Sequence, residues 1–266
     1  MRSGNIDGGN VFNWGRTSKE YAKYRDIYPS EFYKSITDLG LCIKGQRVLD
    51  LGTGTGVLPR NMYHFGADFV GADISQNQIE EARKLSKEHG MNIGYIVNSA
   101  ENVDFPDNSF DVVTASQCFI YFDLPVVLPK IHRVLKNEGH FLVLWMAWLP
   151  DEDRIASASE KLVLKFNPSW TGAGAKRAKL DIPEWSKTFF AAENSILYDL
   201  NVPFTRESWH GRIKACRGIG ASSLSDDVIA EFDHEHRELL REAPETFTIL
   251  HYVSILDLVK TQSLLS

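Results

Sequence analysis

The 266-residue chain has few cysteines, no excess of positive charge and no long apolar run. Its three cysteines, Cys42, Cys118 and Cys216, contain no C-x-x-C pair, which argues against a zinc site and favours reduced thiols in a cytoplasmic protein. The chain has no run of about 18 apolar residues, so we expect no membrane span. The opening MRSGNIDGGN lacks the apolar centre of a secretory signal. The net charge of −6 argues against a large nucleic-acid surface, because such domains carry a basic face.

Two widespread phosphate-binding motifs are also missing. The P-loop requires G-x-x-x-x-G-K-[ST], and no such run occurs. The dinucleotide-binding turn requires G-x-G-x-x-G, but Val57 occupies the position of its third glycine. These absences exclude the usual signatures of nucleoside triphosphate and NAD binding.

A different glycine pattern is present, G-x-G-x-G at Gly52, Gly54 and Gly56. The apolar run 47–51 before it predicts a strand, and the pattern 57–64 after it predicts a helix. Glycines allow positive φ and let a ligand approach the backbone closely. A strand, a tight glycine turn and a helix N-terminus form the arrangement with which α/β proteins hold nucleotide-like ligands.

Two acids near this turn restrict the ligand. Asp50 lies within the strand before the turn, and Asp73 ends the next apolar run, 17 residues after Gly56. An acid at the end of the second strand can accept hydrogen bonds from both hydroxyls of a ribose, although it can also cap the following helix. A ligand with a ribose and no pyrophosphate, such as S-adenosylmethionine, fits this pattern better than NAD.

Four motifs in order resemble one protein family. VLDLGTGTG (48–56) is similar to its first motif, and VGADIS (70–75) to the segment that carries its ribose-binding acid. NSAENVDFPDNSFDVVTAS (98–116) resembles its adenine loop and fourth strand, and KIHRVLKNEGHFLVL (130–144) its turn into the fifth strand. Over residues 10–148 the chain thus resembles the class I S-adenosylmethionine-dependent methyltransferases. Within them it resembles the small-molecule branch of quinone-biosynthesis and trans-aconitate methyltransferases.

The resemblance implies S-adenosylmethionine as the cofactor, S-adenosylhomocysteine as the product, and a set of cofactor-binding positions. In the family, the acid at Asp50 helps to hold the amino group of the methionine moiety, although an acid here can also simply cap the turn. Arg25 lies one helical turn after Tyr21 and can hold the methionine carboxylate, or is simply a surface arginine. The family often has an aspartate at the position of Ser99, so the adenine contact departs from its pattern here. The expected cofactor-binding residues are Tyr21, Arg25, Asp50, Gly52, Thr53, Gly54, Gly56, Asp73, Ile74, Gln78, Ser99, Ala100, Glu101, Ser116, Gln117 and Tyr121.

Alternating strands and helices predict an α/β fold. The resemblance implies a doubly wound, Rossmann-like sheet of seven strands, mostly parallel with an antiparallel last strand, plus a helical lid. We expect strands at 47–51, 68–73, 93–97, 110–115, 140–147, 195–202 and 247–259, and helices at 18–28, 30–39, 57–64, 76–89, 124–135, 151–166, 205–217 and 225–241. The expected organisation is N-terminal helices over the cofactor site (1–45), a Rossmann-like core (46–148), lid insertions that bind the acceptor (149–194 and 205–245), and closing strands of the core sheet (195–204 and 246–261).

Catalytic candidates are weak. His210 in the lid can serve as a general base, although a lone histidine is more often a packed or solvent-facing residue. Tyr121, after the fourth strand, is a second weak candidate. His234 and His236 lie two residues apart, a spacing that does not share a helix face, so we expect no metal site.

Aromatic and basic residues of the lid suggest how an acceptor is selected. Trp145 and Trp148 either line the acceptor pocket or pack in the core. Arg206, Arg212 and Arg217 either recognise an acidic substrate or form a solvated helix face.

Three functions remain open from the sequence. The preferred one is methylation of a small-molecule acceptor by in-line displacement, by a monomer or a homodimer. The second is methylation of RNA or protein, for which no basic face or extra module is visible. The third is cofactor binding without catalysis, against which the intact glycine turn argues.

Overall fold

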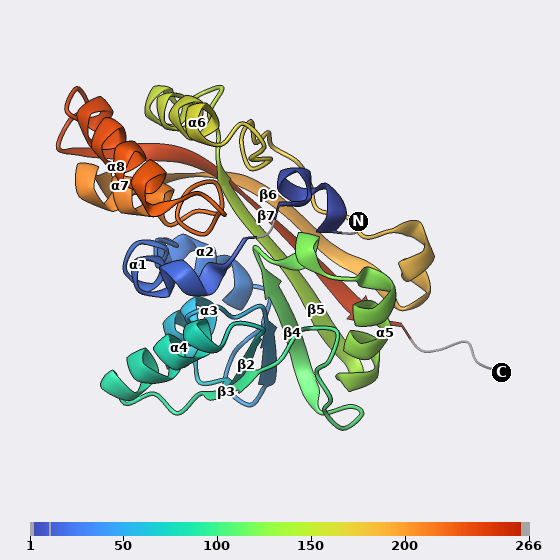
Figure 1. Ribbon diagram of the computed structural model, residues 1–266. Helices are drawn as coiled ribbons and strands as arrows, with labels where there is room; N and C mark the ends of the chain where they lie inside the picture. Colours follow the sequence, from blue (N-terminus) through green and yellow to red (C-terminus); the bar gives the residue numbers. More distant parts are fainter. Residues whose placement is uncertain (1–2, 11, 262–266) are drawn as a thin grey trace.

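The computed structural model describes residues 3–10 and 12–261, and for residues 3–5 and Tyr21 it describes the backbone alone. At its centre lies a seven-stranded sheet in the order β3-β2-β1-β4-β5-β7-β6 (Figure 1). Strand β7 is antiparallel to both of its neighbours, and strands β1 to β5 pair in parallel. This topology confirms the doubly wound sheet with an antiparallel last strand. The strands are β1 (Arg47–Leu51), β2 (Asp68–Asp73), β3 (Gly94–Val97), β4 (Phe110–Ser116), β5 (Leu135–Trp148), β6 (Phe190–Thr205) and β7 (Thr246–Lys260).

Eight α-helices and five short 3-10 helices accompany the sheet in the described part of the chain. The α-helices are α1 (Ser18–Tyr24), α2 (Ser30–Thr37), α3 (Val57–Met62), α4 (Gln76–Glu88), α5 (Leu124–Val134), α6 (Arg154–Phe166), α7 (Arg206–Lys214) and α8 (Asp226–Leu240). The 3-10 helices are η1 (Ser3–Gly9), η2 (Trp14–Thr17), η3 (Tyr63–Phe65), η4 (Phe119–Tyr121) and η5 (Glu184–Thr188).

Alternate residues of the central strands face two helix layers. Val48 of β1 belongs to a buried cluster with Phe32 of α2 and Met62 of α3. Its neighbour Leu49 belongs to a second cluster, with Val127 of α5. Successive side chains of a strand point to opposite faces, so a parallel strand buried on both faces reads as an unbroken apolar run. That is why the run at 47–51 predicted a central strand correctly.

The helix caps follow the sequence signals. Ser75 accepts a hydrogen bond from the Gln78 amide and starts α4, and Gly90 follows the end of α4 with φ of +65°. Ser225 starts α8 in the same way. Thr205 and Ser208 form a reciprocal capping box that fixes the start of α7.

The last three strands are longer than the sequence patterns indicated. Strand β5 begins at Leu135, directly after α5, and not at residue 140. Strand β6 covers Phe190–Thr205 and therefore includes residues 190–194, which we expected in the lid. The half-exposed and charged residues of β6 weaken the apolar alternation from which a strand is recognised, because β6 is an edge strand with β7 as its single neighbour.

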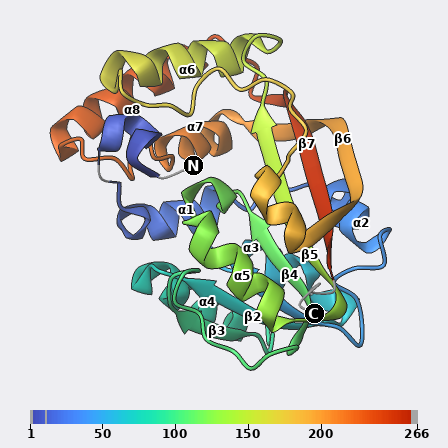
Figure 2. The ribbon, with the colours of Figure 1, turned by 90° about the vertical axis from the view of Figure 1, so that its right-hand side faces the viewer.

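The long strands carry a helical layer at one end. In Figure 1, β5, β6 and β7 run from the core toward α6, α7 and α8, which gather at the upper end of the molecule. Figure 2 shows α1 between this layer above and α4 below. A close contact agrees with this placement, because a Cβ atom on Gly211 of α7 would lie 2.3 Å from the Tyr24 ring of α1.

Smaller differences concern helix ends. Helix α6 begins at Arg154 and not at residue 151, and α7 ends at Lys214 and not at residue 217. Helix α1 ends at Tyr24 and not at residue 28, before the extended residue Pro29. Helix α3 ends at Met62 and continues as η3, which Gly66 closes with φ of +87°. In the part of the chain that the structure describes, no helix combines the length and apolar content that a membrane span requires.

Candidate functional site

The glycine turn after β1 has the conformation that its sequence predicts. Gly52, Gly54 and Gly56 have φ of +65°, +55° and +72°, in the left-handed region that favours glycine. A Cβ atom on Gly52 would lie 2.7 Å from the side chain of Cys118, and one on Gly56 would lie 2.3 Å from the Tyr95 hydroxyl. Close packing as well as backbone conformation therefore requires glycine at positions 52 and 56.

Asp73, at the end of β2, connects this turn to α4. The amide of Gly54 donates to Oδ2 of Asp73 and the amide of Ser75 donates to Oδ1, each at 2.8 Å. Burial raises the pKa of Asp73, and these two hydrogen bonds act in the opposite direction. Asp73 thus holds the residue that caps α4, but the N-cap of this helix is Ser75 and not Asp73 itself. It also lines the cavity described below.

Asp50 has a different position from Asp73. It is buried in β1, and Thr114 of β4 donates a hydrogen bond of 2.6 Å to its Oδ1 atom. Burial raises the pKa of Asp50 to about 6. The side chain lies behind the glycine turn and is not among the residues that line the cavity.

A cavity of about 380 Å³ joins the carboxyl ends of β1, β2 and β4 to the helical layer around α7. In open α/β sheets, ligands bind at this edge, where the strand order reverses. Twelve of the sixteen expected cofactor-binding residues line it. They are Arg25, Gly52, Gly54, Asp73, Ile74, Gln78, Ser99, Ala100, Glu101, Ser116, Gln117 and Tyr121.

Three of the other four expected residues do not line this cavity. Asp50, Thr53 and Gly56 lie behind it, within the turn and the strand. The side chain of Tyr21 lies outside the part of the chain that the structure describes.

An aromatic segment before α1 covers one side of the cavity. The Phe12 ring lies 5.5 Å from the Tyr121 ring and 6.0 Å from the Trp14 ring, measured between centroids. The Trp14 carbonyl accepts a hydrogen bond of 3.0 Å from the Gln78 amide group on α4. The Arg25 guanidinium lies 5.7 Å from the Trp14 ring centroid. This segment therefore links the N-terminal residues to the helix that follows Asp73.

Trp148 forms a fixed wall on the lid side. Its indole N–H donates a hydrogen bond of 2.6 Å to Glu160 of α6, and its ring makes an edge contact with Trp209. Burial raises the pKa of Glu160. The Arg212 guanidinium lies 5.0 Å from the Trp148 ring centroid and is 7% exposed. Trp148 thus packs in the core and also lines the cavity, and its contact with an acceptor stays a prediction.

Two glycines make room for a second aromatic wall, Trp170. A Cβ atom on Gly172 would lie 2.5 Å from the Trp170 ring, and one on Gly218 would lie 2.9 Å from it. The ring is buried and lines the cavity. Its position is therefore set by two loops that are 46 residues apart in the sequence.

His210 lies away from this cavity. It is 1% exposed, and it forms hydrogen bonds of 3.0 Å with His236 and with Asp233 of α8. Burial lowers the pKa of His210. The weak catalytic candidate is thus a packed histidine between α7 and α8. Within the described residues, no group of three or more potential ligands could hold a metal ion.

The three arginines considered as acceptor ligands differ in whether they line the cavity. Arg206 lies outside the cavity, where its guanidinium donates to the Ala243 carbonyl. Arg217 and Arg212 both line the cavity, but Arg217 forms an ion pair with Asp7.

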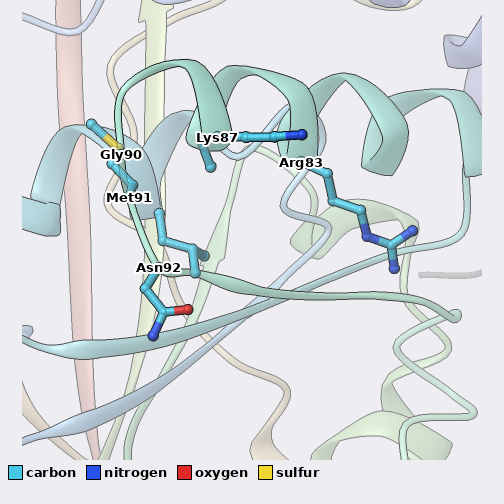
Figure 3. Close-up of a pocket in the computed structure, with 7 residues that line it drawn as sticks. Arg83, Lys87, Gly90, Met91 and Asn92 are labelled. Carbon is cyan, nitrogen blue, oxygen red and sulfur yellow. The ribbon is translucent and has the colours of Figure 1, made fainter.

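A second hollow, of about 320 Å³, lies at the far end of α4 (Figure 3). Arg83 and Lys87 border it, with Gly90, Met91 and Asn92. The chain passes from here into the amino end of β3, so this hollow is at the opposite edge of the sheet from the glycine turn. It is not where the fold places a ligand.

Several lining residues were not among the expected site residues. Phe12 and Trp14 carry a visible signal, an aromatic pair just before the first helix, but the sequence did not show what the pair would face. Cys216, Gly172 and Ala175 carry no signal, because tertiary folding alone brings their loops to the cavity.

Comparisons with known proteins agree with this geometry. Residues 49–143 match the family model of a methyltransferase domain. The uncharacterized methyltransferase YcgJ of Bacillus subtilis is 28% identical over 244 residues, which cover 87% of this chain and 88% of that protein. Its crystal structure aligns with a TM-score of 0.55 at 22% identity, covering 88% of this chain and all of that one.

Two further relatives match over shorter segments. A Dictyostelium discoideum protein whose name describes it as a methyltransferase is 33% identical over 132 residues, 50% of this chain and 48% of that protein. The ubiquinone/menaquinone biosynthesis C-methyltransferase UbiE of Vibrio campbellii is 39% identical over 106 residues, 38% of this chain and 41% of that protein. The matched segments thus span about half or less of these two relatives.

Proposed function

We propose that this class I S-adenosylmethionine-dependent methyltransferase transfers the methyl group of its cofactor to a small-molecule acceptor. The observation that carries the proposal is a continuous cavity that joins the glycine turn to the aromatic residues of the lid segments. A concave, largely apolar cavity with a few polar groups is typical of small-molecule sites. The name of UbiE describes a relative that acts in quinone biosynthesis, which supports the same class of acceptor.

The residues at the glycine turn fit the cofactor. Asp73 accepts two backbone hydrogen bonds, and a carboxylate has further lone pairs for the two hydroxyls of a ribose. Gly52 and Gly54 line the cavity without side chains, so a ligand can approach the backbone there. We assign the ribose to Asp73, the adenine to the segment Ser99–Glu101 and the methionine carboxylate to Arg25.

The protein itself contributes little to the bond-forming step. Bound S-adenosylmethionine supplies an activated methyl group on a sulfonium. The cavity residues bind and orient the acceptor and exclude water. Holding two reactants in a near-attack geometry can lower a barrier by about 7–11 kcal/mol. Of the two catalytic candidates, Tyr121 lines the cavity and carries a hydroxyl that can exchange a proton, whereas His210 is packed elsewhere.

We further propose that the segments 149–194 and 205–245 act as the acceptor-binding lid. Helices α6 and α7 lie in these segments and contribute Glu160, which fixes Trp148, and Arg212, which contacts it. The lid therefore shapes the cavity wall, whereas the turn and Asp73 serve the cofactor.

Thermal unfolding with and without ligands tests the proposal. A ligand at about 100 times its dissociation constant adds about 2.7 kcal/mol to stability, and each kcal/mol raises Tm by about 2–4 °C for a domain of this size. We expect S-adenosylmethionine and S-adenosylhomocysteine to raise Tm by several degrees, and NAD to leave it unchanged. Unchanged Tm with both adenosyl ligands would contradict the proposal. A positive result would be followed by an assay of methyl transfer to a panel of acceptors.

A further inference from the structure

One non-glycine residue that lines the cavity has a left-handed backbone. Gln117, directly after β4, has φ of +65°. Such a conformation is unfavourable for a long side chain, and it persists where the surrounding structure enforces it, often at functional sites. Glycine or asparagine would adopt it more easily, which points to a contact that the longer side chain makes. The other described non-glycine residues with positive φ do not line the cavity: Asp7, Cys42, Asn108 and Glu138.

The Gln117 side chain binds the next strand of the sheet. Its Nε2 atom donates a hydrogen bond of 2.7 Å to the backbone carbonyl of Met146 on β5. Its backbone amide donates a second one, of 2.9 Å, to the Leu144 carbonyl. A carbonyl only accepts hydrogen bonds, so the NH₂ side of the amide group faces Met146. Gln117 therefore joins β4 to β5 beyond the last regular pair of these strands, Ser116 and Leu144.

The residue after Gln117 binds the strand on the other side of β4. The Cys118 thiol donates a hydrogen bond of 3.0 Å to the Leu51 carbonyl at the end of β1, and a Cβ atom on Gly52 would lie 2.7 Å from Cys118. Burial raises the pKa of this thiol, so it stays protonated and remains a donor. Because β4 lies between β1 and β5, two consecutive residues bind both of its neighbours.

These contacts lie at the boundary between the two halves of the cavity. Gly52 and Cys118 line the cavity at the glycine turn, and Met146 and Trp148 line it toward the lid. In the proposed reaction the methyl group passes from the first half to the second. A misplacement of about 1 Å between reactants can lower a rate by about 10²-fold, so this boundary is where a rigid wall matters most.

We propose that Gln117 is a positioning residue of the cofactor site. Its side-chain amide anchors the segment 116–118 to β5 and thereby holds that segment against the glycine turn. The bound cofactor then keeps a fixed place relative to the acceptor side of the cavity. Gln117 acts through Cys118 and Met146 and needs no contact of its own with the reacting atoms. This inference rests on the proposed methyltransferase function and deepens it by assigning a residue that sets its geometry.

Two replacements test the anchor by isothermal titration calorimetry and thermal unfolding. Gln117→Met keeps the length of the side chain but cannot donate to the Met146 carbonyl. We expect the dissociation constant of S-adenosylhomocysteine to rise about two- to tenfold, because one hydrogen bond is lost. Gln117→Gly also removes the anchor but relieves the positive φ, so it should bind as weakly as Gln117→Met and unfold at a higher Tm. Unchanged affinity in either variant, or affinities that simply follow Tm, would overturn the proposal.

Replacement by glutamate gives a readout that packing alone does not change. An ionised carboxylate has no hydrogen to donate to the Met146 carbonyl, whereas a protonated one donates through its O–H group. We therefore compare the dissociation constant of S-adenosylhomocysteine in Gln117→Glu with that of the unmodified protein as the pH falls. The ratio should fall from about tenfold or more near pH ~8 to about twofold or less near pH ~5.5, as the introduced acid takes up a proton.

Gln117→Met is the reference for this pH profile, because its side chain does not titrate. Its ratio to the unmodified protein should stay constant over the same pH range. Taking ratios removes the titration of Asp50 and Asp73, whose pKa values burial raises and which all three proteins share. A ratio for Gln117→Glu that is as independent of pH as that for Gln117→Met would overturn the proposal.

Glu138→Gly is the matched control for the backbone. Glu138 has φ of +60°, is exposed near the start of β5 and lies outside the cavity. Its replacement should leave S-adenosylhomocysteine affinity within about twofold of the unmodified protein, and a loss as large as in Gln117→Gly would overturn the proposal. Absence of S-adenosylhomocysteine binding by the unmodified protein would contradict the methyltransferase function. Retained binding with equal affinity in the Gln117 variants would contradict the role of Gln117 alone.

Discussion

Asp73 is the side chain whose replacement tests the cofactor half of the cavity most directly. Its carboxylate accepts hydrogen bonds from the Gly54 and Ser75 amides, and it lines the cavity. In Asp73→Ala we expect the dissociation constant of S-adenosylhomocysteine to rise by about tenfold or more, because charge-assisted hydrogen bonds are lost. Isothermal titration calorimetry measures it.

Asp68→Ala is the matched control for this variant. It removes the same charge from the opposite end of β2, where Asp68 pairs with Arg47 at the surface. Affinity for S-adenosylhomocysteine should stay as in the unmodified protein. Equal affinities in both variants would remove the ribose assignment.

At the residue scale, the sequence predicted positions whose role depends on local geometry. The three glycines require positive φ, and Asp73 stands at a fixed distance after them, so both could be read from a short window. Asp50 is a residue whose environment could not be predicted from a short window. Its place in the strand was visible, but its burial against Thr114 depends on the pairing of β1 with β4. The same holds for Trp170, whose pocket is formed by distant glycines.

At the scale of elements, the contact between α7 and α8 contains a buried histidine pair. His236 is fully buried, and it bonds His210 through Nδ1 and the Ser159 hydroxyl through Nε2, each at 3.0 Å. Asp233, Lys214 and Arg237 surround the pair. Burial and the charge of His210 lower the pKa of His236 to about 3. His236 is therefore neutral in the folded protein at neutral pH.

This pair makes stability depend on pH. In the unfolded chain histidine titrates near ~6.5, so below that pH the unfolded state binds a proton that folded His236 does not. The stabilisation is fully present above ~6.5 and is lost as the pH falls toward 3, by up to ~1.4 kcal/mol per pH unit. We expect Tm to fall between pH 6.5 and 4.5, and to fall less steeply in His236→Gln, as differential scanning calorimetry would show.

His234→Gln provides the comparison within α8. This histidine is exposed and lies two residues before His236. Its replacement should leave the slope of Tm against pH unchanged. A slope in His236→Gln as steep as in the unmodified protein would contradict the role of the buried pair.

Elements with strong periodicity or buried runs were predicted well, and the edge of the sheet was not. Strands β1, β2 and β4 read as apolar runs because both of their faces are buried. Strand β6 exposes much of its length, so its first five residues were taken for lid. Helix α7 buries both His210 and Arg212, and no local pattern shows which of them faces the cavity and which faces α8.

At the scale of the whole molecule, one cavity is closed by segments that lie far apart in the sequence. Phe12 packs against Tyr121 at 5.5 Å between ring centroids, and both line the cavity. Aromatic contacts of this kind contribute about 0.5–1.5 kcal/mol. We therefore expect Phe12→Ala to release S-adenosylhomocysteine about two- to tenfold faster.

Stopped-flow displacement measures that rate. Trp185→Ala removes an aromatic ring that is 45% exposed and does not line the cavity, so its release rate should match the unmodified protein. An unchanged rate in Phe12→Ala would show that the N-terminal segment does not control exit of the product.

The monomeric or dimeric state of the protein stays a prediction.

The uninterrupted strands β5, β6 and β7 have a consequence for how the protein holds together. Each is hydrogen-bonded to its neighbour from the core sheet to the helices α6, α7 and α8 (Figure 1). A helical layer attached by flexible linkers could melt or drift separately, but this one shares its ladder of backbone hydrogen bonds with the core. The helical layer and the core sheet therefore belong to one cooperative unit. A substitution that destabilises the helical layer therefore lowers the folding stability of the entire chain.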